Sequence, residues 1–312
     1  MKFSILVATY NQKIEDILFT LKSCINQDYD DYEIIVADDG SKDNHFEQIK
    51  DFFKKNKFQS YLLVDNEVNQ GTVKNVISGL NVAKGLYGIS IGSGDALYSE
   101  HILSDLNDFI MKTGYEMFFG LSRTYHESEG KIVFGDNNIP FDINSYLRND
   151  YKKILRNLIM YGDHVCGATI VYKLSIYKEY LENIKNDVKY MEDIFQVKYL
   201  LDGNKMGVFF DYIIYYENAS GISTNRKSNF EKLLNEDVSR FFSKMEKEYP
   251  NNRYLIKRKK INFLYKIDNL YKRTFFRIFV NPECLIYLGD HLVQKCRKCY
   301  KPSEFHKGFF EE

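Results

Sequence analysis

The sequence has little cysteine, no excess of charge of either sign and no long hydrophobic run. Its five cysteines are odd in number and irregularly spaced, which argues against the disulfide framework of a secreted domain. The 43 basic residues equal the 43 acidic ones, so no overall charge would attract nucleic acid. No apolar stretch approaches the roughly 20 residues of a membrane span, and MKFSILVATYNQ at the start lacks the apolar length and cleavage site of a signal peptide. We therefore expect a cytoplasmic protein without a nucleic-acid partner.

The composition of the whole sequence is typical of a globular protein, with 44% hydrophobic and 28% charged residues. The sequence contains no internal repeat and no low-complexity tract. A chain of 312 residues is long enough for one large domain with an appended subdomain.

Strand and helix patterns alternate in the first hundred residues. Continuous apolar, β-prone runs predict strands, and apolar residues spaced by three and four predict helices. The strands are predicted at 3–8, 32–37, 60–65 and 86–92, and the helices at 14–25, 44–55 and 72–84. This alternation predicts an α/β fold with a parallel sheet covered on both faces. Beyond about residue 115 the pattern weakens into shorter strands among helices, and from Phe230 it is mostly helical and basic.

Polar residues follow the predicted strands as TYNQ, DDGS and GSGD, and we expect them to meet at one edge of the sheet. The adjacent acids Asp38 and Asp39 need hydrogen-bond donors if they are buried, such as a nucleobase N–H or ribose hydroxyls. The alternative is that Asp39 or Ser41 caps the following helix.

Two further segments allow both a functional and a structural interpretation. In NQGTVKN, free amides after a glycine turn, together with Lys74, could face a diphosphate, or the glycine could simply form a turn. In YMED, the structural interpretation is that Glu192 and Asp193 only interact favourably with the dipole at the start of the following helix. A carboxylate in a cleft could instead act as a general base on an attacking hydroxyl.

Six segments, in this order and approximate spacing, resemble the sequence blocks of family 2 glycosyltransferases, which are inverting nucleotide-sugar enzymes of the A-type fold. They are FSILVATYNQ, QDYDDYEIIVADDGSKD, NQGTVKN with AKGLYGISIGSGD, CGATIVYKLSIYKEY, YMEDIFQVKYLLDGNKMG and YYENASGIST. The resemblance covers about residues 1–225. It implies a Rossmann-like catalytic domain with a nucleotide-sugar-binding half (1–100) and an acceptor half (101–225), followed by a basic helical region (226–312).

The resemblance also assigns roles to individual residues. It implies that the nucleoside of a donor, most simply a UDP-sugar, is held by Thr9, Tyr10, Asn11 and Asp39, with Asp38 in support. Gly71, Lys74 and Asn75 would lie near the ribose and phosphates. Asp193 would be the catalytic base, and Glu192 would orient it or contact the acceptor.

The expected metal site departs from the family pattern. The family normally has Asp-x-Asp after its fourth strand, whereas this chain has Gly92 and Gly94 there and keeps only Asp95. The family's later histidine is also missing from YYENASGIST. The resemblance still implies Mg²⁺ or Mn²⁺ with Asp95 as a ligand, because one carboxylate with phosphate oxygens can suffice for Mg²⁺. The alternative is that Asp95 is a turn residue capping a helix that begins near Ser99.

The basic segment from Arg253 to Val280 combines nine Lys or Arg residues with one acid and an apolar stripe. The stripe consists of Ile261, Leu264, Ile267, Tyr271 and Ile278. Such a helix suits peripheral association with the inner face of the cell membrane, or packing against the catalytic domain or another subunit of a homo-oligomer. The CRKC motif, Cys296 and Cys299 with His291 and His306 nearby, is weak evidence for zinc.

The sequence therefore favours an inverting glycosyltransferase that acts on a saccharide or lipid-linked saccharide in surface polysaccharide synthesis. The missing Asp-x-Asp leaves open a degenerate, non-catalytic protein that binds a nucleotide sugar or a partner. A nucleotidyltransferase is disfavoured, because TYNQKIED lacks the glycine-rich, basic phosphate loop that it would need after the first strand.

Overall fold

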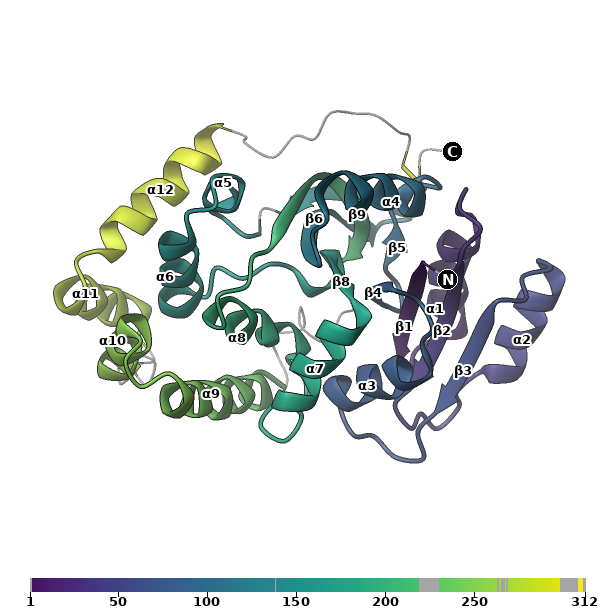
Figure 1. The fold of residues 1–312 in the computed structure, drawn as a ribbon, viewed down its shortest axis with the longest axis horizontal. Helices are drawn as coiled ribbons and strands as arrows, with labels where there is room; N and C mark the ends of the chain where they lie inside the picture. Colours follow the sequence, from purple (N-terminus) through teal and green to yellow (C-terminus); the bar gives the residue numbers. More distant parts are fainter. Residues whose placement is uncertain are drawn as a thin grey trace.

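The structure is a computed structural model that describes residues 2–137, 139–218, 230–262, 264, 267, 269–297 and 308–310. These residues form one nine-stranded sheet with helices on both faces (Figure 1). The strand order is β3-β2-β1-β4-β8-β6-β9-β5, and β7 pairs with β6.

The first half alternates strands and helices as the sequence predicted. The strands are β1 (Phe3–Thr9), β2 (Tyr32–Asp38), β3 (Tyr61–Asp65) and β4 (Tyr87–Gly92), and the helices are α1 (Ile14–Ile25), α2 (Phe46–Lys55) and α3 (Thr72–Val82). These four strands are parallel. Every residue of β2 is buried, which explains why its sequence is apolar except for Glu33 and Asp38.

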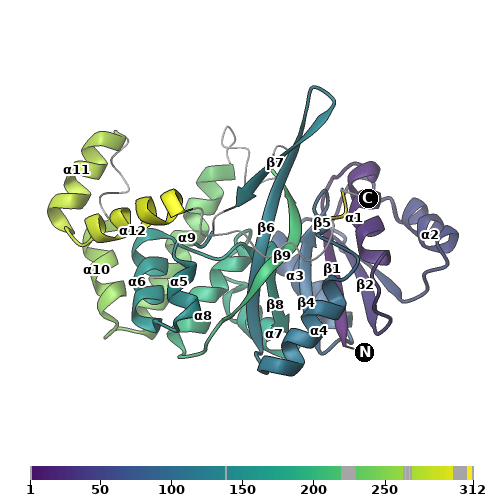
Figure 2. The same cartoon turned by 90° about the horizontal axis from the view of Figure 1, so that it is seen from above.

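The second half continues the sheet with mixed directions. Its elements are β5 (Ala96–Leu97), α4 (Ile102–Thr113), β6 (Met117–Ser128), β7 (Lys131–Asn137), α5 (Ile143–Leu147), α6 (Tyr151–Tyr161), η1 (Gly167–Thr169), β8 (Ile170–Lys173), α7 (Leu174–Ile184), η2 (Glu192–Ile194), α8 (Phe195–Leu201) and β9 (Gly207–Glu217). Strand β8 runs antiparallel to both β4 and β6, whereas β9 is parallel to β6. The β6–β7 hairpin projects beyond the rest of the sheet (Figure 2).

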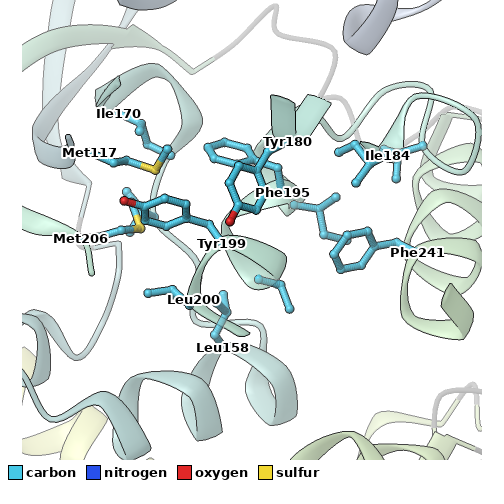
Figure 3. Close-up of a cluster of buried hydrophobic side chains, with 14 of the residues drawn as sticks. Met117, Leu158, Ile170, Tyr180, Ile184, Phe195, Tyr199, Leu200, Met206 and Phe241 are labelled. Carbon is cyan, nitrogen blue, oxygen red and sulfur yellow. The ribbon is translucent and has the colours of Figure 1, made fainter. Parts of the chain in front are cut away.

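Two hydrophobic clusters cover the two faces of the sheet. One is formed mainly by the strands with α1, α2 and α4, and the other by α3, the acceptor-half helices and the first C-terminal helices. Figure 3 shows the second cluster, in which Phe195, Tyr199 and Leu200 of α8 lie among side chains from several elements.

Four helices follow the sheet: α9 (Phe230–Glu248), α10 (Arg253–Ile261), α11 (Leu270–Val280) and α12 (Cys284–Arg297). The predicted helical C-terminal region is thus confirmed. Phe241 and Met245 of α9 and Leu255 of α10 belong to the second cluster. The division into domains at residue 225 stays a prediction.

The apolar stripe of this region does not face one side as predicted. Ile261 and Leu264 are buried and Ile267 packs against the second cluster, whereas Tyr271 is 86% exposed. The residues of the stripe are divided between elements, because α10 ends at Ile261 and α11 begins at Leu270. Among the described residues, no helix combines the length and apolarity needed to cross a membrane. Cys299 and His306 of the proposed zinc site lie outside the described residues.

Candidate active site

The tips of β1 and β2 are joined by hydrogen bonds centred on Asp38. Its buried carboxylate accepts hydrogen bonds from the Thr9 hydroxyl at 2.9 Å and from the Ser41 hydroxyl and amide at 2.6 and 2.7 Å. The backbone amide of Asn11 in turn donates to the Ser41 hydroxyl. Thr9, Asn11 and Asp38 therefore fix the two loops to each other, and the Tyr10 ring beside them is exposed.

Asp39 is buried beside these loops and holds the glycine turn that precedes α3. One carboxylate oxygen accepts from the Gln70 amide and the other from the Gly71 amide, both at 2.8 Å. Burial raises the pKa of Asp39, and the two amides and the nearby Lys189 charge oppose this rise. The alternative of a helix cap is wrong, because α2 begins only at Phe46.

The Gly71 turn contacts the segment just before Glu192. Gly71 has φ +89°, and a Cβ added there would lie 2.6 Å from the Lys189 carbonyl oxygen and closer still to Lys189 Cγ. The same carbonyl accepts from the Val73 amide at 3.1 Å. Only glycine permits this conformation and this close approach. The donor-side turn and the segment leading to Asp193 are therefore in direct contact.

Lys74 and Asn75, which were expected near the ribose and phosphates together with Gly71, differ in solvent exposure. Lys74 is exposed on α3. Asn75 is buried: its Nδ2 donates to the Ala37 carbonyl and its Oδ1 accepts from Asn66 Nδ2, both at 2.9 Å. The Asn75 side chain thus links α3 to β2 and to the residue that follows β3, and a position of Asn75 near the ribose and phosphates stays a prediction.

Asp95 is buried at the end of β4, next to Glu217 at the end of β9. Its Oδ1 accepts from the Glu217 amide at 2.8 Å. Burial raises the pKa of Asp95 to about 7, and the Glu217 charge adds to this rise. The Tyr125 hydroxyl donates to the Gly94 carbonyl, which holds the same turn from β6. The alternative of a helix cap is wrong here too, since α4 begins at Ile102.

Glu192 and Asp193 lie in η2, at the end of the segment that contacts the Gly71 turn. Both side chains keep some solvent exposure but are surrounded by protein, and this desolvation raises the pKa of each. The Asp193 charge raises the pKa of Glu192 further, whereas His164 opposes the rise at Asp193. Burial and the adjacent Asp193 charge therefore both favour the protonated form of Glu192.

Cys166 links the Asp95 and Asp193 regions. Its thiol is buried, and the charges of both carboxylates add to burial in raising its pKa to about 12. Both carboxylates therefore act electrostatically on one buried side chain. A thiol with this pKa stays protonated at neutral pH, so Cys166 is no nucleophile.

Sequence reasoning missed three residues that place Asp193. Gly167 approaches it so closely that an added Cβ would lie 3.0 Å from Asp193 Cβ. The buried Gln196 amide donates to the Asp193 carbonyl at 2.9 Å and exchanges hydrogen bonds with the Val165 backbone. His164 lies on the same segment and acts on Asp193 electrostatically. The CGAT block was the available signal for Gly167, and nothing in the sequence distinguished Gln196.

Within the described ranges, no three His, Cys, Asp or Glu side chains are grouped to hold a metal ion. Asp95 nevertheless suits a cation, because a buried carboxylate with a pKa near neutrality lacks a full positive partner. Asp95 is therefore the residue through which a divalent ion could be held, with further oxygens supplied by a diphosphate.

Comparison with known proteins identifies the family of this chain and its fold. A model of the family described as glycosyl transferase family 2 matches residues 4–181, which is more than half of the chain. The poly(ribitol-phosphate) beta-glucosyltransferase of Bacillus spizizenii is 28% identical over 69% of this chain and 32% of its own length. An Escherichia coli UDP-Glc:alpha-D-GlcNAc-diphosphoundecaprenol beta-1,3-glucosyltransferase is 30% identical over 45% of this chain and 53% of its own. The chain thus spans less than two thirds of either relative.

Two solved structures share the fold. Residues 1–349 of Staphylococcus aureus TarS with UDP-GlcNAc align over 77% of this chain and 66% of that chain, with TM-score 0.55 and 21% identity. A mannosyltransferase from Pyrobaculum calidifontis with GDP-Man and Mn²⁺ aligns over 81% and 65%, with TM-score 0.53 and 15% identity. The predicted A-type fold is confirmed, and with the family match over residues 4–181 these findings establish that the chain belongs to glycosyl transferase family 2.

Proposed function

We propose that the protein is an inverting glycosyltransferase that moves a sugar from a nucleoside-diphosphate sugar to a hydroxyl of a saccharide or lipid-linked saccharide. The observation that carries this proposal is the contact between the Gly71 turn, held by Asp39, and the segment that ends at Asp193. Because these segments touch, one donor could be held by the first half while its anomeric carbon faces Asp193.

In the proposed reaction Asp193 is the general base. Its carboxylate takes the proton of the acceptor hydroxyl, and the hydroxyl oxygen attacks the anomeric carbon from the face opposite the diphosphate. The bond to the diphosphate oxygen breaks as the new glycosidic bond forms, so the configuration inverts. Desolvation brings the pKa of Asp193 closer to neutrality, which favours proton transfer. Glu192, protonated beside it, can donate a hydrogen bond to the acceptor or to Asp193.

A UDP-sugar is the donor that the comparisons favour. The S. aureus TarS structure contains UDP-GlcNAc, and the E. coli relative is named for transfer from UDP-Glc to a lipid-linked sugar. We extend this donor class and a role in surface polysaccharide synthesis to this chain. The proposed contacts to the base, the ribose and the phosphates are the exposed Tyr10, the buried Asp39 and the exposed Lys74, respectively.

We further propose that Asp95 holds a divalent cation, Mg²⁺ or Mn²⁺. The nearby Glu217 increases the negative charge at this turn, which favours a cation. When bound, such an ion would neutralise the leaving diphosphate. Lys74 could supply part of the same positive charge from α3.

We also propose that α11 brings the protein to the cytoplasmic face of an anionic membrane. Tyr271, Phe275 and Phe279 recur at a spacing of four and are 86%, 67% and 79% exposed, and Lys272 and Arg273 lie beside them. Aromatic side chains with adjacent basic residues bind the interface of acidic bilayers. Replacing Phe275 and Phe279 by serine should release the protein from phosphatidylglycerol vesicles, and unchanged sedimentation with these vesicles would refute the proposal.

Transfer with a panel of UDP-sugars and Mn²⁺ tests the function. We expect Asp193→Asn to lower kcat at least 100-fold, the lower range for loss of a general base, while donor affinity is kept. Glu182→Gln, which changes an exposed acid on α7, is the matched control and should leave kcat unchanged. NMR of the product should show the inverted anomer. Donor binding by the wild type without any transfer would support the non-catalytic alternative instead.

A further inference from the structure

A fully buried carboxylate in the C-terminal region contacts the segment that carries the proposed base. Asp237 lies on α9 with no exposed surface. Its Oδ2 accepts from three consecutive backbone amides, those of Lys189, Tyr190 and Met191, at 3.0, 2.6 and 3.3 Å. The next two residues along the chain are Glu192 and Asp193.

These hydrogen bonds hold the backbone that leads into η2. Met191 occupies the N-cap position of η2, and its own side chain makes no capping hydrogen bond. Buried backbone amides need an acceptor, and the carboxylate oxygen of Asp237 supplies one to the three amides before η2 from more than forty residues away in the sequence. The conformation in which η2 begins is therefore set by α9.

The buried charge of Asp237 is compensated, so the contact is stable. The Arg240 guanidinium donates to Asp237 Oδ1 at 2.6 Å, and its Nε donates to the Asp187 carbonyl at 2.9 Å. Lys244 contacts the Asp187 carboxylate at 3.1 Å. One face of α9 thus holds both ends of the segment 187–191.

The same segment reaches the donor side. The Lys189 amide donates to Asp237, and its carbonyl accepts from Val73, just after the Gly71 turn. Phe241, one turn after Asp237, packs in the cluster that includes Ile184 and Phe195 (Figure 3). A rigid helix, the Gly71 turn and Asp193 therefore meet through a five-residue segment.

We propose that Asp237 is a positioning residue that aligns the Asp193 carboxylate with the donor-side Gly71 turn through the amides of residues 189–191. This inference rests on the proposed function. It assigns to α9, outside the family match of residues 4–181, a part in forming the active site.

Asp237→Asn tests the inference, with Glu236→Gln on the same helix as the matched control. An asparagine keeps the size of the side chain but loses the charge that binds three amides and Arg240. We expect kcat to fall at least tenfold, with a smaller change in KM, and the amides of residues 189–191 to exchange hydrogen faster. Glu236 is about half exposed and contacts Arg240 only at 3.7 Å, so its variant should stay within twofold of the wild type.

The assay is one in which Asp193→Asn is inactive. If Asp237→Asn folds and its kcat equals that of the wild type in this assay, the inference is wrong and the proposed function is unaffected. If the wild type transfers no sugar, the proposed function fails, and hydrogen exchange alone decides whether Asp237 anchors the segment. If Asp237→Asn does not fold, hydrogen exchange of these amides in the wild type decides whether Asp237 anchors the segment. Amides 189–191 that exchange as fast as an exposed loop would overturn the inference, and protection equal to that of α9 supports it.

Discussion

Replacing Gly71 by alanine tests the contact on which the proposed site depends. Gly71 has φ 89° and ψ 164°, a conformation that costs a residue with a Cβ on the order of 1–3 kcal/mol. The Cβ would also lie 2.6 Å from the Lys189 carbonyl oxygen, and such overpacking adds about 1–3 kcal/mol. Alanine also lowers the conformational entropy of the unfolded chain, which offsets roughly 0.4–1 kcal/mol of this cost. We therefore expect the free energy of unfolding to fall by about 3 kcal/mol.

Gly114→Ala is the matched control for this change. Gly114 ends α4 with φ +67°, and an added Cβ there meets nothing within 4 Å. Only the left-handed strain of roughly 1–2 kcal/mol applies, so we expect a net loss of about 1 kcal/mol.

Urea unfolding measures both losses, and calorimetric titration of a UDP-sugar measures donor affinity. Gly71→Ala should weaken donor binding at least tenfold, because the turn must move away from Lys189, whereas Gly114→Ala should not change it. Equal losses of stability for the two variants, together with unchanged donor affinity, would refute the reasoning.

Two further changes test the proposed catalytic and metal residues. Gly167→Ala should lower kcat about tenfold, since its Cβ would lie 3.0 Å from Asp193 Cβ and a 1 Å misplacement can cost about 100-fold. A kcat equal to the wild type would contradict this contact. For Asp95, burial raises the pKa from 3.8 to about 7, so the folded state binds the extra proton and stability falls as pH rises through this window. Between pH 5 and pH 8, the melting temperature of Asp95→Asn should therefore fall less than that of the wild type. Equal falls in melting temperature for the two proteins would exclude Asp95 as the titrating group.

The parallel half of the fold followed from local sequence patterns, and the mixed half did not. Strands such as β2 are buried on both faces, so each is a mostly apolar, β-prone run that can be recognised without knowledge of its neighbours. The position of β8 between β4 and β6 depends instead on pairings between segments far apart in the sequence. Single-sequence patterns carry no direct record of such pairings.

The site was predictable to the level of segments but not of side-chain partners. TYNQ and DDGS are joined by hydrogen bonds, and Ser93 of GSGD donates to the Ala8 carbonyl at 3.3 Å, because parallel strands end at one edge of the sheet. The hydrogen bonds of Asn75 could not be predicted, since an asparagine that bridges buried groups looks the same in sequence as one that binds a ligand. Asp237 was missed because its partners are backbone amides, which every sequence contains.

The hydrophobic cluster shared by α9, α10 and the acceptor half determines how the chain can be shortened. Phe241 and Met245 are fully buried against α7 and α8, and Leu255 joins them from α10. A fragment ending at residue 225, where the family resemblance ends, would leave this side of the cluster open to water. A shortened chain made for crystallography or screening should therefore extend at least through α10, and a shorter one is expected to aggregate rather than yield a minimal enzyme.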